Sequence, residues 1–206
     1  MTGQALVREA PIPVEGDAYV DGAIVEVHPK QGVTVETRGT YIQGIFGIGG
    51  ETCGELHVAV GAPSDTLTEA TIGEKDRGKI LVGGAHVTTK TLLHAIQMGV
   101  KAIVIGGFDD HDLREFLGYD LGVAITGSEE KGITLIVTEG FGEIPMASRT
   151  FELLKACEGQ KVSVSGATQI RAGVLRPEII CPRLEAEARS AAPEGTAGEE
   201  GLSVGG

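Results

Sequence analysis

The sequence predicts an α/β protein: a parallel or mixed α/β unit is inserted between N- and C-terminal β segments, which form a small barrel or sandwich. Between residues 78 and 159, continuously apolar runs alternate with helical patterns, as is typical of strands covered on both faces. On either side of this unit, apolar and polar residues alternate with period 2, which indicates half-exposed strands. Glycine makes up 32 of the 206 residues, about twice the usual share, and separates these runs.

The N-terminal part is expected to be a loose lead-in over residues 1–17, followed by an antiparallel β region over residues 18–77. In the first alternating run, Ala23, Val25 and Val27 fall on one side and Ile24 on the other. Glycine or proline bounds each run, as expected for strands joined by turns. The three runs are residues 22–29, 32–39 and 54–61.

The inserted unit, residues 78–159, has its elements in the order strand, helix, strand, helix, strand, strand, helix. Ser, Thr and Asp at helix starts can accept the first free N–H groups, and glycine can take the left-handed position at helix ends. The expected strands are residues 78–84, 101–107, 122–127 and 132–140. The expected helices are residues 88–99, 109–118 and 146–159. Thr88 or Thr89 caps the first helix and Asp109 or Asp110 caps the second. Pro145 suits the first turn of the third.

The first of these helices has an apolar stripe. We expect it to bury Leu92, Leu93 and Ile96 against the sheet and to expose His94.

The C-terminal part returns to period 2 at residues 161–166, and two short strands, or a strand and an arm, follow in residues 169–182. Because chain termini usually lie close together, we expect residues 160–183 to join residues 18–77 in the barrel or sandwich. Residues 184–206 contain mostly Ala, Glu, Gly and Ser. So little apolar surface predicts a disordered tail.

Composition and charge exclude several classes of protein. The chain has 17 basic and 29 acidic residues, a net charge of −12, and only 4% aromatic residues. It therefore lacks the basic surface and stacking side chains of a nucleic-acid binder. Cys53, Cys157 and Cys181 form no C-x-x-C motif, which suits a reducing, cytoplasmic location. The start lacks the pattern of a signal peptide, and no apolar run is long enough for a membrane span.

The candidate site is a rim formed where the predicted strands end. Four strands finish in glycine-bearing turns, and parallel strands bind ligands outside their carboxyl ends. Two turns lead into helix N-termini, which suit anions. Alternatively, glycine merely closes tight turns. In addition, the connection between the strands that end at residue 127 and begin at residue 132 is short enough for a hairpin. An antiparallel pairing of these two strands would remove Glu139 from the rim. The predicted ligand-binding residues are Gly83, Gly84, His86, Thr88, Gly106, Gly107, Asp109, Asp110, Thr126, Gly127, Glu139 and Gly140.

A second glycine-rich segment, residues 41–51, misses the spacing of a dinucleotide loop and lacks the Lys-Ser/Thr of a P-loop. We expect it to form a bulged hairpin. Its apolar residues Ile45, Phe46 and Ile48 belong either to the core or to an exposed contact surface.

Two groups of residues have side chains of the types that bind metals. Cys53, Glu55 and His57 alternate along one strand, on the face opposite Leu56, so we expect that face to be solvated. His86 with Asp109, Asp110, His111 and Asp112 forms a mixed nitrogen and carboxylate set. Because capping explains these aspartates, the sequence predicts no metal site.

Residues 78–107 resemble the strand–helix–strand of swivelling β/β/α domains, which include the protease-associated domains. One branch of that fold carries a phosphohistidine after Gly-Gly-x-Thr-Ser. Here His86 and His94 stand at other spacings and no Thr-Ser precedes them, so the resemblance does not imply phosphotransfer.

Together these observations predict an intracellular, non-catalytic binding or assembly module. It would bind a small anionic molecule or a protein partner at the rim, and it could form a homo-oligomer. The alternative is an enzyme with an acid/base or metal site at His86, Asp109, Asp110 and Glu139. The sequence identifies no cofactor and no reaction.

Overall fold

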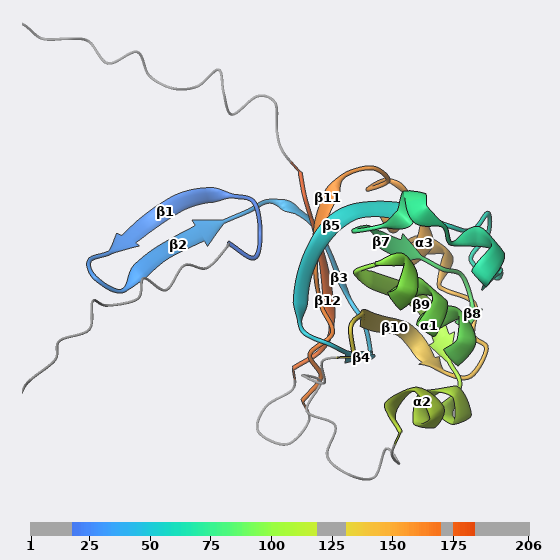
Figure 1. The fold of residues 1–206 in the computed structure, drawn as a ribbon. Coiled ribbons are helices and arrows are strands. Elements are labelled where there is room, and N and C mark those ends of the chain that lie inside the picture. Colours follow the sequence, from blue (N-terminus) through green and yellow to red (C-terminus); the bar gives the residue numbers. More distant parts are fainter. Residues whose placement is uncertain (1–17, 119–130, 170–174, 184–206) are drawn as a thin grey trace, which may run out of the picture.

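A computed structural model describes residues 18–118, 131–169 and 175–183 of the chain. It is a mixed α/β protein with one large mixed sheet and few helices, as Figure 1 shows. None of the helices in these described ranges has the length and apolar character needed to cross a membrane.

The large sheet has eight strands, in the order β3, β12, β11, β5, β7, β9, β10, β4. The four strands β5, β7, β9 and β10 are parallel to one another, and all other neighbours are antiparallel. Their bounds are Gly39–Gln43 (β3), Glu178–Pro182 (β12), Lys161–Ser165 (β11), Glu51–Val58 (β5), Ile80–Val82 (β7), Ala102–Phe108 (β9), Thr134–Phe141 (β10) and Phe46–Ile48 (β4).

The N- and C-terminal β segments do meet, because β3 pairs with β12 and β11 pairs with β5. A separate small barrel or sandwich is not confirmed, since these strands continue in the same sheet as β7 and β9. Only Gly44 and Ile45 separate β3 from β4, so one stretch of chain supplies both ends of the strand order. The division at residues 77 and 160 stays a prediction.

Four short strands lie outside the large sheet. Ala23–His28 (β1) and Gly32–Glu36 (β2) form a two-stranded ribbon that projects away from the rest of the molecule (Figure 1). Thr66–Leu67 (β6) pairs with His86–Val87 (β8). Two 3₁₀ turns, Glu69–Thr71 (η1) and Glu74–Asp76 (η2), lie between β6 and β7.

Helices cover both faces of the central strands. Helices α1, Thr89–Met98, and α2, Asp110–Leu117, contribute Leu92 and Leu113 to one core, while α3, Ser148–Lys155, contributes Phe151 and Leu154 to the other. Side chains alternate between the two faces along each strand. In β7 and β9 this places Leu81, Ile103 and Ile105 in the first core and Ile80, Val82 and Val104 in the second.

The predicted caps of the first two helices are confirmed. Thr88 Oγ1 accepts a hydrogen bond from Thr91 N, and Asp109 Oδ1 accepts one from His111 N. Gly99 and Gly118 take the left-handed conformation after α1 and α2, with φ of 78° and 82°. Helix α3 is shorter than expected, because it begins only at Ser148 and ends at Lys155.

Two local predictions are wrong. Leu93 is 49% exposed, because successive helical residues point about 100° apart and Leu92 already faces the core. His94 is half-buried, with Nε2 3.3 Å from Ile72 O.

The glycine-rich segment of residues 41–51 is not a hairpin, because β4 pairs with β10 and not with a neighbour in sequence. Phe46 and Ile48 are core residues, whereas Ile45 is 41% exposed.

The second core contains two buried thiols, Cys157 and Cys181. Burial, together with the neighbouring Cys157 thiol, raises the pKa of Cys181 from 9.0 to about 12. Burial also raises the pKa of Tyr19 and of Tyr41, with Glu178 adding to both. All three groups therefore stay protonated in the folded protein over a pH range in which the unfolded chain ionises.

Stability is therefore expected to fall in alkali. The contribution of Cys181 is complete below pH 9 and is lost as the pH rises toward 12, because only the unfolded chain releases the proton there. Each such group contributes about 1.4 kcal/mol per pH unit at most. Between pH 9 and 10.5, the free energy of unfolding of the wild type, measured with urea, should fall by about 1–2 kcal/mol more than that of Cys181→Ala. The control Cys53→Ala should follow the wild type, and equal slopes for all three proteins would contradict the prediction.

Candidate functional site

The rim predicted from the sequence can be traced along three parallel strands. Gly106 N donates to Gly84 O at 2.8 Å, and Gly107 pairs with Gly140 in the register of β9 and β10. These glycines therefore lie side by side at the carboxyl ends of β7, β9 and β10, and the parallel direction of β10 keeps Glu139 at that end. The predicted strand at residues 122–127, with Thr126 and Gly127, lies outside the described residues.

The rim glycines are close to the backbone of other loops. A Cβ atom on Gly84 would lie 2.2 Å from Asp65 O, and one on Gly106 would lie 2.3 Å from Ile144 O. On Gly107 it would lie 2.1 Å from Gly142 O. These are distances that no side chain tolerates, so the loops of residues 62–65 and 142–146 require glycine here.

The amide groups of the rim are also engaged inside the protein. Gly83 N donates to Val104 O at 2.8 Å, and Gly107 N donates to Ala85 O at 2.9 Å. Gly106 N is bonded to Gly84 O as described above. Since a backbone anion site needs free N–H groups, these three cannot provide one.

Two further predicted residues lie where α1 begins. Thr88 is the N-cap of α1, and His86 in β8 places Nε2 3.5 Å from Asp112 Oδ2. The His86 Nδ1 atom is buried without a hydrogen-bond partner. Asp112 itself accepts hydrogen bonds from the Thr89 hydroxyl at 3.0 Å and from Thr89 N at 3.3 Å. It therefore links α2 to the first turn of α1.

Two of the three predicted carboxylates are engaged within α2, and the third is engaged at the start of α3. Asp109 caps α2, and Asp110 Oδ2 forms an ion pair with Arg114 at 2.7 Å. Glu139 Oε1 accepts a hydrogen bond from Ala147 N at 3.0 Å, just before α3 begins. These are a helix cap, a surface ion pair and a backbone contact, and they do not direct the three carboxylates toward one reacting group.

One group of side chains has atoms close enough together to hold a cation: His111, Asp112 and Glu115, within 4.8 Å of one another. It lies in the first turns of α2, and Asp112 also faces the start of α1. The positive ends of two helix dipoles favour carboxylates and disfavour cations at this place. Of these residues, Asp112 bonds to the first turn of α1.

The rim does expose apolar side chains. Phe141 is 51% exposed and Ile45 is 41% exposed. A Cβ atom on Gly140 would lie 3.0 Å from Ile144 Cδ1 and 3.8 Å from Ile45 Cδ1, so both side chains cover that glycine. The Phe141 ring contacts the buried Phe46 ring, with centroids 5.4 Å apart. Because successive strand residues face opposite sides, Phe141 lies on the other face of β10 from Ile45 and Ile144. We call these three side chains, which surround the end of β10 from both faces, the rim patch.

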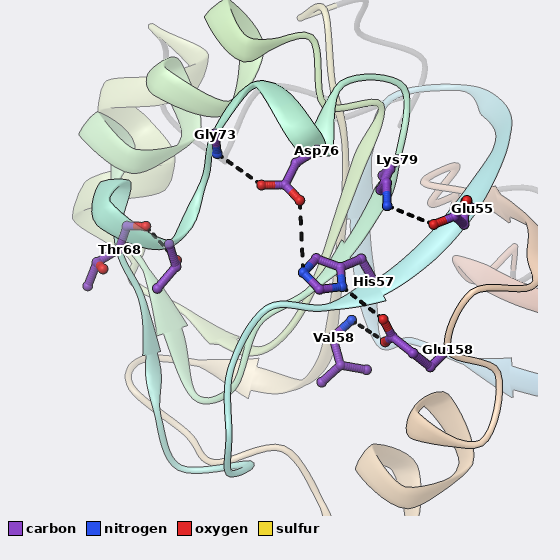
Figure 2. A network of polar contacts seen from close by, with 9 residues as sticks. Glu55, His57, Val58, Thr68, Gly73, Asp76, Lys79 and Glu158 are labelled. Atoms are coloured by element: carbon purple, nitrogen blue, oxygen red, sulfur yellow. Dashed lines mark hydrogen bonds and ion pairs between the residues drawn. The ribbon is translucent and has the colours of Figure 1, made fainter.

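A polar network, drawn in Figure 2, connects β5 to two distant segments. His57 Nδ1 lies 2.8 Å from Glu158 Oε1, and His57 Nε2 lies 3.9 Å from Asp76 Oδ1. The Asp76 side chain is only 1% exposed, and its other oxygen accepts a hydrogen bond from Gly73 N at 2.9 Å. Glu158 Oε2 accepts one from Val58 N.

Both ring nitrogens of His57 thus face carboxylate oxygens. Only the contact with Glu158 is within hydrogen-bond distance, and the buried Asp76 Oδ1 has no hydrogen-bond partner. Beside it, Lys79 Nζ donates to Glu55 Oε1 at 2.7 Å, which lowers the pKa of Glu55 and raises that of Lys79. The network holds η2 and the turn after α3 against β5.

Sequence reasoning missed this network. It expected the face of Cys53, Glu55 and His57 to be solvated, although His57 has only 26% of its side chain exposed. Glu158 follows His57 by 101 residues, and no local pattern connects the two.

Two cavities lie elsewhere in the described part of the chain. One of about 440 Å³ lies where β9 and β10 begin, at the opposite end of the sheet from the rim, and is lined by residues that include Lys101 and Thr134. The other, of about 430 Å³, is lined by residues that include Asp21, Gln160 and Arg183. Neither is lined by a residue that the sequence predicts to bind a ligand.

Comparisons with known proteins do not add a family to this geometry. No protein-family model, no curated protein and no solved structure matches the chain. The resemblance of residues 78–107 to swivelling domains stays a prediction, and the functional argument rests on the contacts of the chain itself.

Proposed function

We propose that this protein is a non-catalytic assembly module that binds a protein partner at the rim through the rim patch. The observation that supports this proposal is a contrast at the rim. The N–H groups of Gly83, Gly106 and Gly107 are bonded within the protein, while Phe141 and Ile45 remain about half exposed. The sequence suggests two classes of ligand. A small anion would need free N–H groups, and a protein needs exposed apolar side chains.

The chemistry of the patch defines the partner. Phe141 is fixed by the β10 ladder and by the Phe46 ring, so ordering it on binding costs little entropy. Rigid aromatic side chains of this kind are frequent at the centres of protein interfaces. Glu143 is exposed beside the patch, and the chain carries a net charge of −12. The partner is therefore a protein with an apolar centre and basic residues around it.

The enzyme alternative has less support. It needs His86, Asp109, Asp110 and Glu139 to act on one reacting group. Asp109 and Asp110 are bonded within α2, and Glu139 is bonded to Ala147 N before α3. The cytoplasmic location stays a prediction from the cysteines.

Photo-crosslinking in the native cells tests the proposal. With benzoylphenylalanine in place of Phe141, we expect a discrete covalent adduct with another protein. Ile45→Glu in the same chain should reduce that adduct at least tenfold, because it places a charge in the apolar contact. The matched control position is Leu93, which is 49% exposed but lies on α1, and it should give no such adduct.

A second measurement separates the two ligand classes. Inorganic phosphate added to the purified protein should leave the NMR signals of the Gly84, Gly106 and Gly107 amides unchanged. Saturable shifts of these amides, with no adduct at position 141, would overturn the proposal in favour of a small anionic ligand.

A further inference from the structure

The β1–β2 ribbon is amphipathic because of a β-bulge. In the ladder, Ile24 pairs with Val35 and Val27 pairs with Val33, and the register shifts between Ile24 and Glu26. Paired residues share a face of a sheet, and Val33 and Val35 are two positions apart. The extra residue, Val25, therefore brings Ile24 onto the face of Val27, where strict alternation would have kept them apart.

The two faces of the ribbon differ completely in chemistry. Ile24, Val27, Val33 and Val35 form one face, which we call the ribbon face, and they are 63%, 66%, 49% and 37% exposed. The opposite face carries Glu26, His28 and Thr34. His28 Nε2 lies 2.8 Å from Thr34 Oγ1, at hydrogen-bond distance, and 3.6 Å from Glu26 Oε2. A sheet face made only of aliphatic side chains is stable when another surface covers it.

The ribbon is held firmly at its base. Ser163 Oγ donates a hydrogen bond to Tyr19 O, and Lys161 forms an ion pair with Asp21 at 3.0 Å. On the other strand, Arg183 N donates to Arg38 O at 2.7 Å. From this base the ribbon projects away from the large sheet (Figure 1). An isolated two-stranded ribbon is only marginally stable in water, so its own fold gains from being covered.

We propose that the ribbon face binds the ribbon face of a second copy of this chain. The ribbon carries little of the chain's negative charge, so a second copy can approach it with little repulsion. Residues 18–38 contain two basic and three acidic residues, so they carry −1 of the net charge of −12. Two acidic bodies repel each other, and contact through a nearly neutral projecting arm keeps them apart. The ribbon face has no charged side chain, so a two-fold contact brings no like charges together.

The size of the contact predicts a weak dimer. A strand of six residues is about 20 Å long, and two paired strands are about 10 Å wide. This area is well below the roughly 800 Å² per partner of a standard stable interface. We therefore expect a dimer that forms only at high protein concentration. It would use a surface separate from the rim patch and would leave that patch free.

Sedimentation velocity on the purified full-length chain, from 5 µM to 1 mM, tests the proposal. The mean mass should rise with concentration from the monomer value of 21.3 kDa toward twice that value. Val33→Lys places a charge in the contact and should raise the dissociation constant about 100-fold or more. Thr34→Lys is the matched control. It adds the same charge one residue away, on the opposite face and across from Glu26, and should stay within about threefold of the wild type.

Crosslinking gives a readout that does not depend on the stability of a charged ribbon. Stacked sheets lie about 10 Å apart, so a short bis-maleimide should join two copies of Val33→Cys and not two copies of Thr34→Cys. Both variants carry Cys53→Ser. A wild type that remains monomeric at 1 mM would overturn the proposal. A dimer that persists in Val33→Lys, or one that crosslinks equally well at both positions, would overturn it too.

Discussion

Gly107→Ala is expected to lower the free energy of unfolding by at least about 3 kcal/mol. The new methyl group would lie 2.1 Å from Gly142 O and 2.7 Å from Ile144 N. Both of these atoms belong to backbone, and the loop that holds them is tied to the sheet, because Gly142 N donates to Phe108 O at 2.9 Å. The methyl group therefore cannot be accommodated by turning a side chain, and either the loop or β9 must move.

Gly50→Ala is the matched control for this substitution. No atom lies within 4 Å of a Cβ at Gly50, so we expect a change within about 0.5 kcal/mol. Urea unfolding of the two variants measures the difference. If Gly107→Ala were as stable as Gly50→Ala, the loop of residues 142–146 would be able to leave the rim. Space for a small ligand would then open beside Gly106 and Gly107.

His57→Ala is expected to lower the free energy of unfolding by about 3 kcal/mol. Asp76 is buried, and without His57 its carboxylate keeps only the hydrogen bond from Gly73 N. Removing the ring that faces this buried carboxylate leaves the carboxylate less well compensated, which costs more than the contact itself contributes. Glu158→Gln is the control, because that side chain is 45% exposed and the amide oxygen can still accept from Val58 N. It should cost under about 1 kcal/mol.

A double-mutant cycle distinguishes the contact from simple loss of packing. Asp76→Ala in the His57→Ala background removes the uncompensated carboxylate, so the double variant should be no less stable than His57→Ala alone. Strictly additive losses would show that His57 and Asp76 act independently, contrary to this explanation.

The elements that local chemistry determines were predictable from the sequence. The strands β7, β9 and β10 were expected from their apolar runs, and α1 and α2 from Thr88, Asp109 and the glycines that end them. The βαβ connection from β7 through α1 to β9 also predicts the parallel direction, because such a crossover returns the chain in the same sense.

The candidate site was predictable only in part. The neighbouring positions of Gly84, Gly107 and Gly140 follow from parallel strands of similar length. The role of these glycines does not follow, because glycine serves a bound ligand and a closely packed loop equally well. The loops that pack against these glycines come from residues 62–65 and 142–146. Neither loop is adjacent in sequence to β7 or β9.

By itself, the sequence determined where α1 and α2 begin and end, which apolar runs become β7, β9 and β10, and that the chain is acidic. These properties depend on residues a few positions apart. Only the tertiary structure decided that β3 and β4 occupy the two ends of one sheet, that His57 meets Asp76 and Glu158, and that Ile24 shares a face with Val27. The physical reason is that strand register and ionic contacts depend on long-range pairing. A bulge of one residue changes which side chains share a face without leaving a clear mark on the local pattern.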